Sequence, residues 1–407
     1  MSVEKLIISL DFENLKIQLG ELVQHDKNYF FKFDPNFLNC ELDISPFKMK
    51  RSSGILQADN KPFDGIFGVF NDSLPDGWGR LLLDRTLLSK GKSLADITLI
   101  DRLAYVGKNG MGALVYEPEE THGLRNNFLV DLDKVYSETV KIFEDVNSEY
   151  IEDLFEMGGS SGGARPKIFI GYNPKTDQIV QEELILKAEF EHWIVKFPTT
   201  KDLKDIANIE YAYYKMAIAC GIEMSDSKLF QGRSGKNYFA TKRFDKIGNS
   251  RLHMHSAAGL MHDNFRESSM DYGHLMDCAF KLEKHQDAYE KVFRLSVFNV
   301  IFHNRDDHSK NFSFLMNADG KWNFSPAYDL TFSNSSHGHH NTMIMGESKN
   351  PTSKDLLKLA NYFGLKSGKE IIDEVFDTAQ KWKTFANDSN LSKLTIDMIE
   401  KKIKEFK

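Results

Sequence analysis

Alternating apolar and polar residues predict strands in the first third of the chain. Leu15, Ile17 and Leu19 alternate with Lys16 and Gln18, which is the period-two pattern of a strand with one buried face. The same reasoning predicts further strands at 29–33 and 112–116, and helical spacing predicts a helix around 78–88. We therefore expect an α+β unit in this part of the chain.

Apolar residues at helical spacing are frequent in the rest of the chain. They predict one helix through Leu132, Val135 and Phe143 and another through Ile209 and Tyr213, each with one apolar face. Short strands are predicted at 167–171, 192–197 and 238–244. The last third is predicted to be mostly helical.

Two polar stretches interrupt these patterns. Residues 117–127 are acidic and polar and contain Pro118, which predicts a linker. Residues 334–340, Asn-Ser-Ser-His-Gly-His-His, predict a loose surface loop.

Composition narrows the class of protein. The chain has 407 residues, of which 41% are hydrophobic, so it can bury a sizeable core. Its 52 basic and 59 acidic residues give a net charge of −7, whereas a stand-alone nucleic-acid binder needs a basic face. Three cysteines make neither a disulfide framework nor a zinc motif, and no signal peptide or membrane-spanning run is visible. We expect a soluble, cytoplasmic protein.

The most informative segment joins a buried helix to a polar cluster. Apolar residues predominate in 292–302, and 303–311 then run His-Asn-Arg-Asp-Asp-His-Ser-Lys-Asn. A hairpin is expected next, because Asp-Gly at 319–320 is a strong turn signal. If Met316 pairs with Lys321, Asn311 lies opposite Pro326, and Asn311 and Asp329 emerge at the same end of the hairpin.

This arrangement suits phosphoryl transfer. An amide oxygen and a carboxylate at one place can share Mg²⁺, and protein kinases combine a base Asp, a metal-binding Asn and a second metal-binding Asp. We therefore predict Asp306 as the catalytic base, Asn311 and Asp329 as metal ligands, and ATP as the phosphate donor. Lys310 can neutralise charge on the transferred group, and His308 can orient the loop or contact nucleotide.

Two upstream features could hold phosphate. Residues 158–167, Gly-Gly-Ser-Ser-Gly-Gly-Ala-Arg-Pro-Lys, form a loop whose backbone N–H groups can approach phosphate oxygens, although the Gly-Lys-Ser/Thr ending of a Walker A motif is absent. Lys196 lies in the middle of an apolar strand, where a buried ammonium needs a partner. The phosphates of ATP could supply one, and Glu210 could pair with it. The strand at 238–245 would run into a hinge between two lobes, where its backbone groups would meet adenine.

Taken together, these motifs resemble the HipA-type serine/threonine kinases of bacterial toxin–antitoxin modules over nearly the full length. The resemblance rests on Leu-Pro-Asp-Gly-Trp-Gly-Arg at 74–80, on Val106-Gly107 with Gly112–Leu114, and on five later segments in the family's order. Those five are 160–167, 193–198, 242–245, 304–311 and 327–330.

The resemblance implies a two-lobed, protein-kinase-like α+β fold. It divides the chain into an amino-terminal α/β subdomain (1–117), a linker helix and ATP-binding lobe (118–245) and a mostly helical lobe with the catalytic loop and metal site (246–407). The ATP-binding residues that it implies are Gly162, Gly163, Ala164, Arg165, Pro166, Lys167, Lys196, Lys242, Arg243, Phe244, His308, Lys310, Asn311, Tyr328 and Asp329. It also implies autophosphorylation at Ser160, although the adjacent Ser161 leaves that assignment open. Arg165-Pro166 before the lysine departs from the best-known member of the family, so regulation could differ.

The resemblance further implies partners. These are a small helix-turn-helix antitoxin of the HipB type, DNA only through that antitoxin, and a protein substrate such as an aminoacyl-tRNA synthetase, with growth arrest as the outcome. Three alternatives remain. One is a metal-dependent hydrolase built on His303, Asp306, Asp307, His308 and the loop histidines. The others are an inactive corepressor that acts with a DNA-binding antitoxin, and a small-molecule phosphotransferase.

Overall fold

The computed structural model describes residues 3–120, 129–144, 148, 150–158, 162–335 and 337–406. Two compact units are present, and neither is continuous in sequence. The first consists of Met1–Asp202, Phe230–His255 and Leu315–Lys321, and the second of Leu203–Leu229, Ser256–Phe314 and Trp322–Lys407. The boundaries predicted after residues 117 and 245 stay predictions. Ser160, Ser161 and most of the predicted linker lie outside the described residues.

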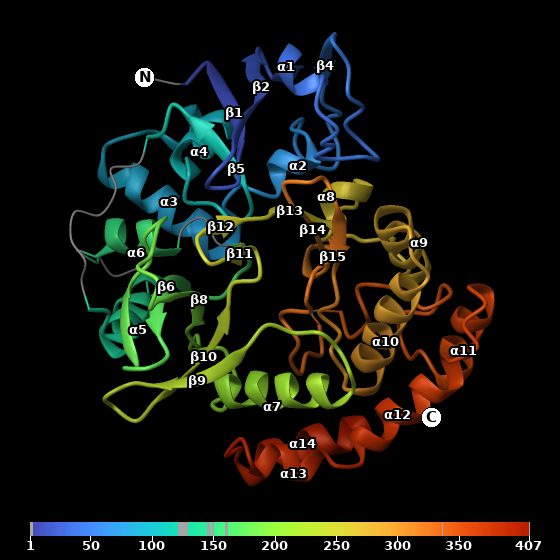
Figure 1. The fold of residues 1–407 in the computed structure, drawn as a ribbon. Coiled ribbons are helices and arrows are strands. Elements are labelled where there is room, and N and C mark those ends of the chain that lie inside the picture. Colours follow the sequence, from blue (N-terminus) through green and yellow to red (C-terminus); the bar gives the residue numbers. More distant parts are fainter. Residues whose placement is uncertain are drawn as a thin grey trace. The chain divides into compact units, whose positions relative to one another are not determined.

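The first unit begins with an antiparallel sheet of strand order β4-β3-β2-β1-β5 (Figure 1). Its strands are β1 (Lys5–Asp11), β2 (Lys16–His25), β3 (Asn28–Phe33), β4 (Ile55–Gln57) and β5 (Leu114–Glu117). The helical elements of this part are α1 (Pro35–Leu38), α2 (Gly68–Asn71), α3 (Gly77–Ser89), η1 (Leu94–Asp96) and α4 (Leu99–Val106). The predicted strands and the predicted helix near 78–88 are confirmed. α4 starts at a capping box between Thr98 and Asp101.

A second sheet has strand order β7-β6-β8-β10-β9, and its strands β6, β7, β8 and β10 lie in the first unit. Its strands are β6 (Lys167–Asn173), β7 (Gln178–Gln181), β8 (Glu191–Lys196), β9 (Ser227–Gln231) and β10 (Asn237–Lys242). Nearby elements are α5 (Leu132–Phe143), α6 (Ile151–Gly158), β11 (Lys246–Ile247), β12 (Ser250–Arg251) and β13 (His253–Ser256). Every residue of β6 is buried, which is why this strand is an apolar run rather than an alternation.

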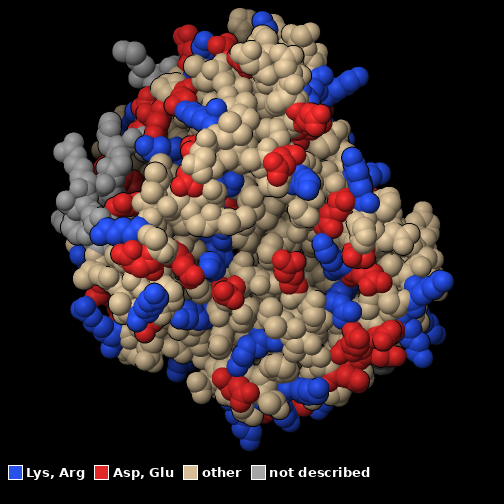
Figure 2. Space-filling view, in the orientation of Figure 1, with Lys and Arg blue, Asp and Glu red and all other residues tan. Residues whose placement is uncertain are grey.

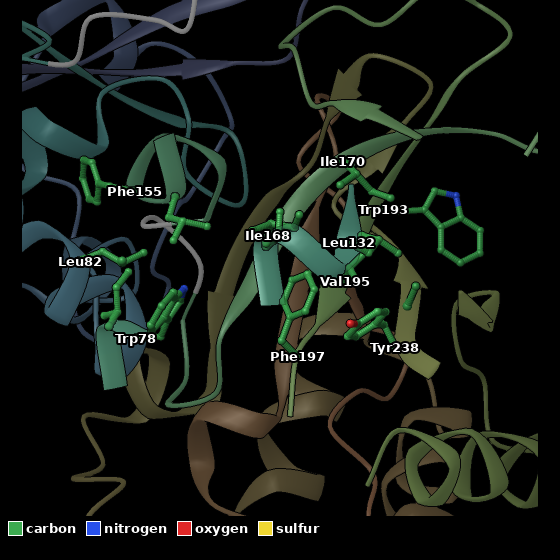
Figure 3. Close-up of a cluster of buried hydrophobic side chains, with 14 of the residues drawn as sticks. Trp78, Leu82, Leu132, Phe155, Ile168, Ile170, Trp193, Val195, Phe197 and Tyr238 are labelled. Carbon is green, nitrogen blue, oxygen red and sulfur yellow. The ribbon is translucent and has the colours of Figure 1, made fainter. Parts of the chain in front are cut away.

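One hydrophobic cluster joins helices α3 and α6 to the second sheet (Figure 3). Trp78 comes from α3, Phe155 from α6, Ile168 from β6 and Val195 from β8. These side chains are 6% exposed or less. The elements on both sides of the glycine-rich segment therefore share one core.

The second unit is mostly helical, as predicted. Its helical elements are α7 (Ile206–Ala219), α8 (Ala257–Met261), α9 (Tyr272–Glu283), α10 (Asp287–Ile301), η2 (Ser309–Asn311), α11 (Ser353–Tyr362), α12 (Gly368–Ala379), α13 (Trp382–Asn387) and α14 (Lys393–Ile403). A hairpin follows η2. Its strands are β14 (Ser313–Met316), whose last two residues belong to the first unit, and β15 (Trp322–Phe324). No helix in the described ranges is long and apolar enough to cross a membrane.

Candidate active site

The predicted catalytic loop leaves α10 through a residue in the left-handed conformation. α10 ends at Ile301, and His303 has φ 55°. Asn304 is tied back to the helix, because its backbone N–H donates to the Asn299 carbonyl and its Nδ2 donates to Asn299 Oδ1, each at 2.9 Å. The buried helix therefore fixes the start of the loop.

Asp307 is the buried anchor of this loop, a role that the sequence did not assign. One carboxylate oxygen accepts from the Tyr272 hydroxyl and from His340 Nδ1, each at 2.9 Å. The other accepts from the backbone N–H groups of Asn341 at 2.8 Å and Thr342 at 3.4 Å. Burial raises the pKa of Tyr272 well above its usual value, so its hydroxyl stays a donor. Four donors thus hold one carboxylate that is 1% exposed.

Asp306, the predicted base, lies in the opposite environment. Its side chain is 56% exposed, and its Oδ1 lies 4.0 Å from His308 Nε2. Its backbone carbonyl accepts from Asn311 Nδ2 at 2.7 Å. This bond turns the Asn311 amide nitrogen toward the loop backbone, so the amide oxygen is the atom that can meet a cation. Two adjacent aspartates are therefore separated into an accessible carboxylate and a structural one.

An aromatic ring holds the next part of the loop. Lys310 Nζ lies 4.8 Å from the centre of the Phe265 ring, and this ring lies 5.5 Å from the ring of His308. Ser309, between them, is buried and donates to Asp263 Oδ2. His308 and Lys310, both predicted to contact nucleotide, are thus placed around one ring, partly by a cation–π contact.

The hairpin after the loop is present, but its predicted register is wrong by one residue. Ser325 donates its backbone N–H to the Ser313 carbonyl at 2.9 Å. Extending this register places Asn311 opposite Ala327, one residue beyond the prediction. The reason is the turn: Gly320 adopts φ 77° and closes a three-residue connection.

The return segment still reaches the catalytic loop. The Tyr328 hydroxyl donates to the Lys310 carbonyl at 2.7 Å and lies 2.6 Å from Ser313 Oγ. Asp329 follows with φ 54°, a left-handed conformation that Asp tolerates better than most residues. The sharing of one metal ion by Asn311 and Asp329 stays a prediction.

The described part of the glycine-rich segment, 162–167, is held by charged side chains. Lys167 is 7% exposed and donates from Nζ to the Gly162 carbonyl at 2.5 Å. Arg165 forms an ion pair with Asp202 at 3.0 Å. The segment therefore has fixed contacts within the first unit.

Lys196 lies in a central strand rather than at an edge. It stands opposite Lys167 of β6 on one side and Phe239 of β10 on the other. Its Nζ lies 5.5 Å from the centre of the Phe239 ring. The predicted partner Glu210 is 3% exposed and belongs to the second unit, so this pairing stays a prediction.

The side chains at the predicted hinge are bound to carboxylates. Lys242 donates to Glu191 at 2.7 Å. Arg243 is buried and donates to Glu182 at 2.7 Å and to both oxygens of Asp245 at 2.7 and 3.0 Å. These ion pairs occupy both side chains, so contact with adenine would have to come from the backbone of this strand end, and the hinge role stays a prediction.

The histidines of the hydrolase alternative serve other contacts. Burial, followed by the nearby Arg305, lowers the pKa of His303 to about 4, and its Nε2 lies 3.0 Å from Asn334 Oδ1. His340 is 5% exposed and bound to Asp307, so the prediction of a loose loop is wrong at this residue. Among the residues that the structure describes, no group of three His, Cys, Asp or Glu side chains could hold a metal ion.

Comparison with solved structures finds proteins of known structure that are similar to this chain. The chain is similar to a structure described as the Shewanella oneidensis MR-1 toxin–antitoxin system HipA, HipB and its operator DNA complex, with a TM-score of 0.69 and 18% identity. That match covers 98% of this chain and 95% of the other. A second similarity is to the Helicobacter pylori proinflammatory kinase CtkA, with a TM-score of 0.37, 14% identity and coverage of 53% and 86%. A comparison with curated proteins found no match.

Family models match both parts of the sequence. The model of the HipA N-terminal domain matches residues 15–117. The model of the HipA-like C-terminal domain matches residues 159–383, which is more than half of the chain. With the α+β fold shared along nearly the whole length, this match shows that the chain belongs to the HipA family.

Proposed function

We propose that the chain is an ATP- and Mg²⁺-dependent serine/threonine protein kinase. The observation that carries the proposal is the contrast between Asp306 and Asp307. A general base must be within reach of the substrate hydroxyl, and Asp306 is exposed. The carboxylate of Asp307 is held by four donors, so the exposed base is carried on a rigid loop.

The residues at this site then take different roles. Asp306 accepts the proton of the attacking hydroxyl, and Lys310 lends positive charge to the transferred phosphoryl group. The Asn311 amide oxygen and the Asp329 carboxylate would hold Mg²⁺, which prefers oxygen ligands. When bound, Mg²⁺ neutralises charge on the phosphates of ATP. His308 and Tyr328 would contact the nucleotide at the same loop.

The first unit supplies the phosphate and adenine contacts in this proposal. Lys196 and the segment 162–167 would bind the phosphates, and the backbone at 242–244 would meet adenine. Support comes from the register of the sheet, which places Lys196 of β8 directly opposite Lys167 of that segment. Ser160 is the proposed site of autophosphorylation.

Membership of the HipA family suggests the partners of this chain. The Shewanella protein is described in a complex with HipB and operator DNA, and we propose a HipB-like helix-turn-helix antitoxin for this chain. DNA would be contacted through that antitoxin, because the net charge is −7. Figure 2 shows acidic and basic residues together on one face of the molecule. The chain would act as a cytoplasmic toxin that arrests growth by phosphorylating a translation protein such as an aminoacyl-tRNA synthetase.

Transfer of labelled phosphate from ATP tests the proposal. Asp306→Ala is expected to lower the rate by about 10²–10⁴-fold because it removes the general base, with no loss of thermal stability since the side chain is exposed. Asp329→Asn is expected to raise the Mg²⁺ concentration needed for half-maximal activity. Asp319→Ala, at an exposed position in the hairpin turn, is the matched control and should behave as wild type. Full labelling by the Asp306 variant would exclude Asp306 as the base.

A further inference from the structure

The start of α3 holds the glycine-rich segment of the same unit by its backbone. Gly163 donates its N–H to Asp76 Oδ1, and the Gly163 carbonyl accepts from the Trp78 N–H at 3.1 Å. The neighbouring Gly162 carbonyl is held by Lys167 at 2.5 Å. Both backbone polar groups of Gly163 are therefore bound to α3.

Asp76 occupies the N-cap position of α3 without capping its own helix. An N-cap side chain normally accepts from an N–H group in the first turn, as Asp131 does in α5 and Ser256 does in α8. Asp76 makes no such bond, because its carboxylate faces Gly163. In return, the Gly163 carbonyl takes one of the unpaired N–H groups at the start of α3.

Gly77 allows the two backbones to approach this closely. It has φ 43°, a conformation that glycine adopts most readily. A Cβ atom at this position would lie 2.5 Å from the Gly163 carbonyl oxygen and 2.6 Å from Ala164 Cα. Any side chain at residue 77 would therefore have to displace the glycine-rich segment.

Trp78 fixes the contact to the core of the first unit. Its side chain is 1% exposed, and its ring stacks on Phe143 at 5.4 Å. It shares a hydrophobic cluster with Phe155 of α6 and Ile168 of β6 (Figure 3). α6 precedes the glycine-rich segment and β6 follows it, so the residue that binds Gly163 is anchored to the elements on both sides of that segment.

We infer that Asp76, Gly77 and Trp78 form a clamp that positions the glycine-rich segment for the phosphates of ATP. The inference rests on the proposed function. In this clamp, Gly163 holds the segment in place, because its N–H already donates to the Asp76 carboxylate. A segment that is fixed in advance loses less freedom when ligand binds. The clamp should therefore lower the KM for ATP and leave the phosphoryl-transfer step at Asp306 unchanged, so its members are positioning residues.

Steady-state kinetics and amide hydrogen exchange test the clamp in the full chain. Asp76→Ala is expected to raise the KM for ATP on the order of tenfold, as expected for loss of one charge-assisted hydrogen bond, and to change kcat little. Gly77→Ala should do the same, because its methyl group displaces Gly163. Asp76→Asn keeps an oxygen acceptor and should recover most of the wild-type KM. Without nucleotide, both alanine variants should exchange faster in a peptide covering 162–167.

Asp131→Ala is the matched control, since it removes an N-cap aspartate that bonds to its own helix start and pairs with the exposed Arg233. The inference is overturned if the exchange of 162–167 is unchanged in Asp76→Ala and Gly77→Ala, or if Asp131→Ala raises the KM for ATP equally. A fall in kcat at constant KM would also overturn it. Hydrogen exchange needs no catalysis, so absence of phosphotransfer by the wild-type chain would refute the kinase proposal and leave the contact itself testable.

Discussion

Two adjacent aspartates should respond in opposite ways to the same substitution. Asp306→Ala is expected to lower the rate of phosphotransfer strongly and leave stability unchanged, as set out above. Asp307→Ala is expected to destabilise the second unit, because the buried carboxylate of Asp307 accepts from Tyr272, His340 and two backbone N–H groups. The comparison is matched in residue type, in loop and in the substitution made.

The expected loss can be worked out from the contacts. Removing one partner from a buried polar network leaves the others unsatisfied, and breaking a buried charged pair costs about 3–5 kcal/mol. In a domain of this size class, about 1 kcal/mol shifts the melting temperature by roughly 2–4 °C. Asp307→Ala should therefore lower the melting temperature by about 6–20 °C. Asp307→Asn keeps one oxygen acceptor and should lower it by less.

Differential scanning calorimetry of Asp306→Ala, Asp307→Ala and Asp307→Asn measures these shifts directly. The order of melting temperatures should be wild type equal to Asp306→Ala, then Asp307→Asn, then Asp307→Ala. Equal melting temperatures for the two alanine variants would refute the assignment of Asp307 as the loop anchor. A normal melting temperature with lost activity in Asp307→Ala would instead give Asp307 a part in the chemistry.

Two groups of the first unit, the half-buried Glu156 and the buried His253, predict how stability depends on pH. Burial, followed by Asp153 and Glu152, raises the pKa of Glu156 from 4.5 to about 7. The folded protein then holds this proton more tightly than the unfolded chain does, so stability is lost as pH rises through about 7. Glu156→Gln should raise the melting temperature above that pH and change it little near pH 4.5, and an unchanged value at the higher pH would contradict this. Burial, followed by His255, lowers the pKa of His253 from 6.5 to about 3, so the unfolded chain gains a proton as pH falls below about 6.5 and stability decreases. His253→Gln should flatten that acid-side loss, whereas an equally steep loss in the variant would show that other groups cause it.

Periodic patterns predicted several elements of this fold, but not every contact between them. The strands around Phe31 and Ile168 and the helix before His303 follow from apolar spacing, because regular structure repeats its buried face. The hairpin after the loop was predicted from Asp-Gly, yet its register was wrong because a left-handed Gly320 makes the turn one residue shorter than the four residues expected. In the irregular loop at 303–311 no period exists, so the sequence could not tell which of the two aspartates is buried.

The burial of His340 could not be predicted from local sequence patterns either. A run of polar residues predicts exposure, but a polar side chain can be buried where a specific partner compensates its desolvation. That partner is Asp307, distant in sequence, so no local pattern contains the information.

The contact between Asp76 and Gly163 is the clearest case of a residue whose role could not be predicted from the residues around it. An aspartate before a helix predicts an ordinary N-cap, and only the fold shows that its carboxylate binds a loop far along the chain. A double variant can test whether Asp76 and Gly77 act through this one contact. Effects of independent substitutions add, whereas substitutions that remove the same contact do not. Asp76→Ala and Gly77→Ala each release Gly163, so the double variant should raise the KM for ATP little more than either single variant. Additive effects would mean that the two residues act separately and that no shared clamp exists.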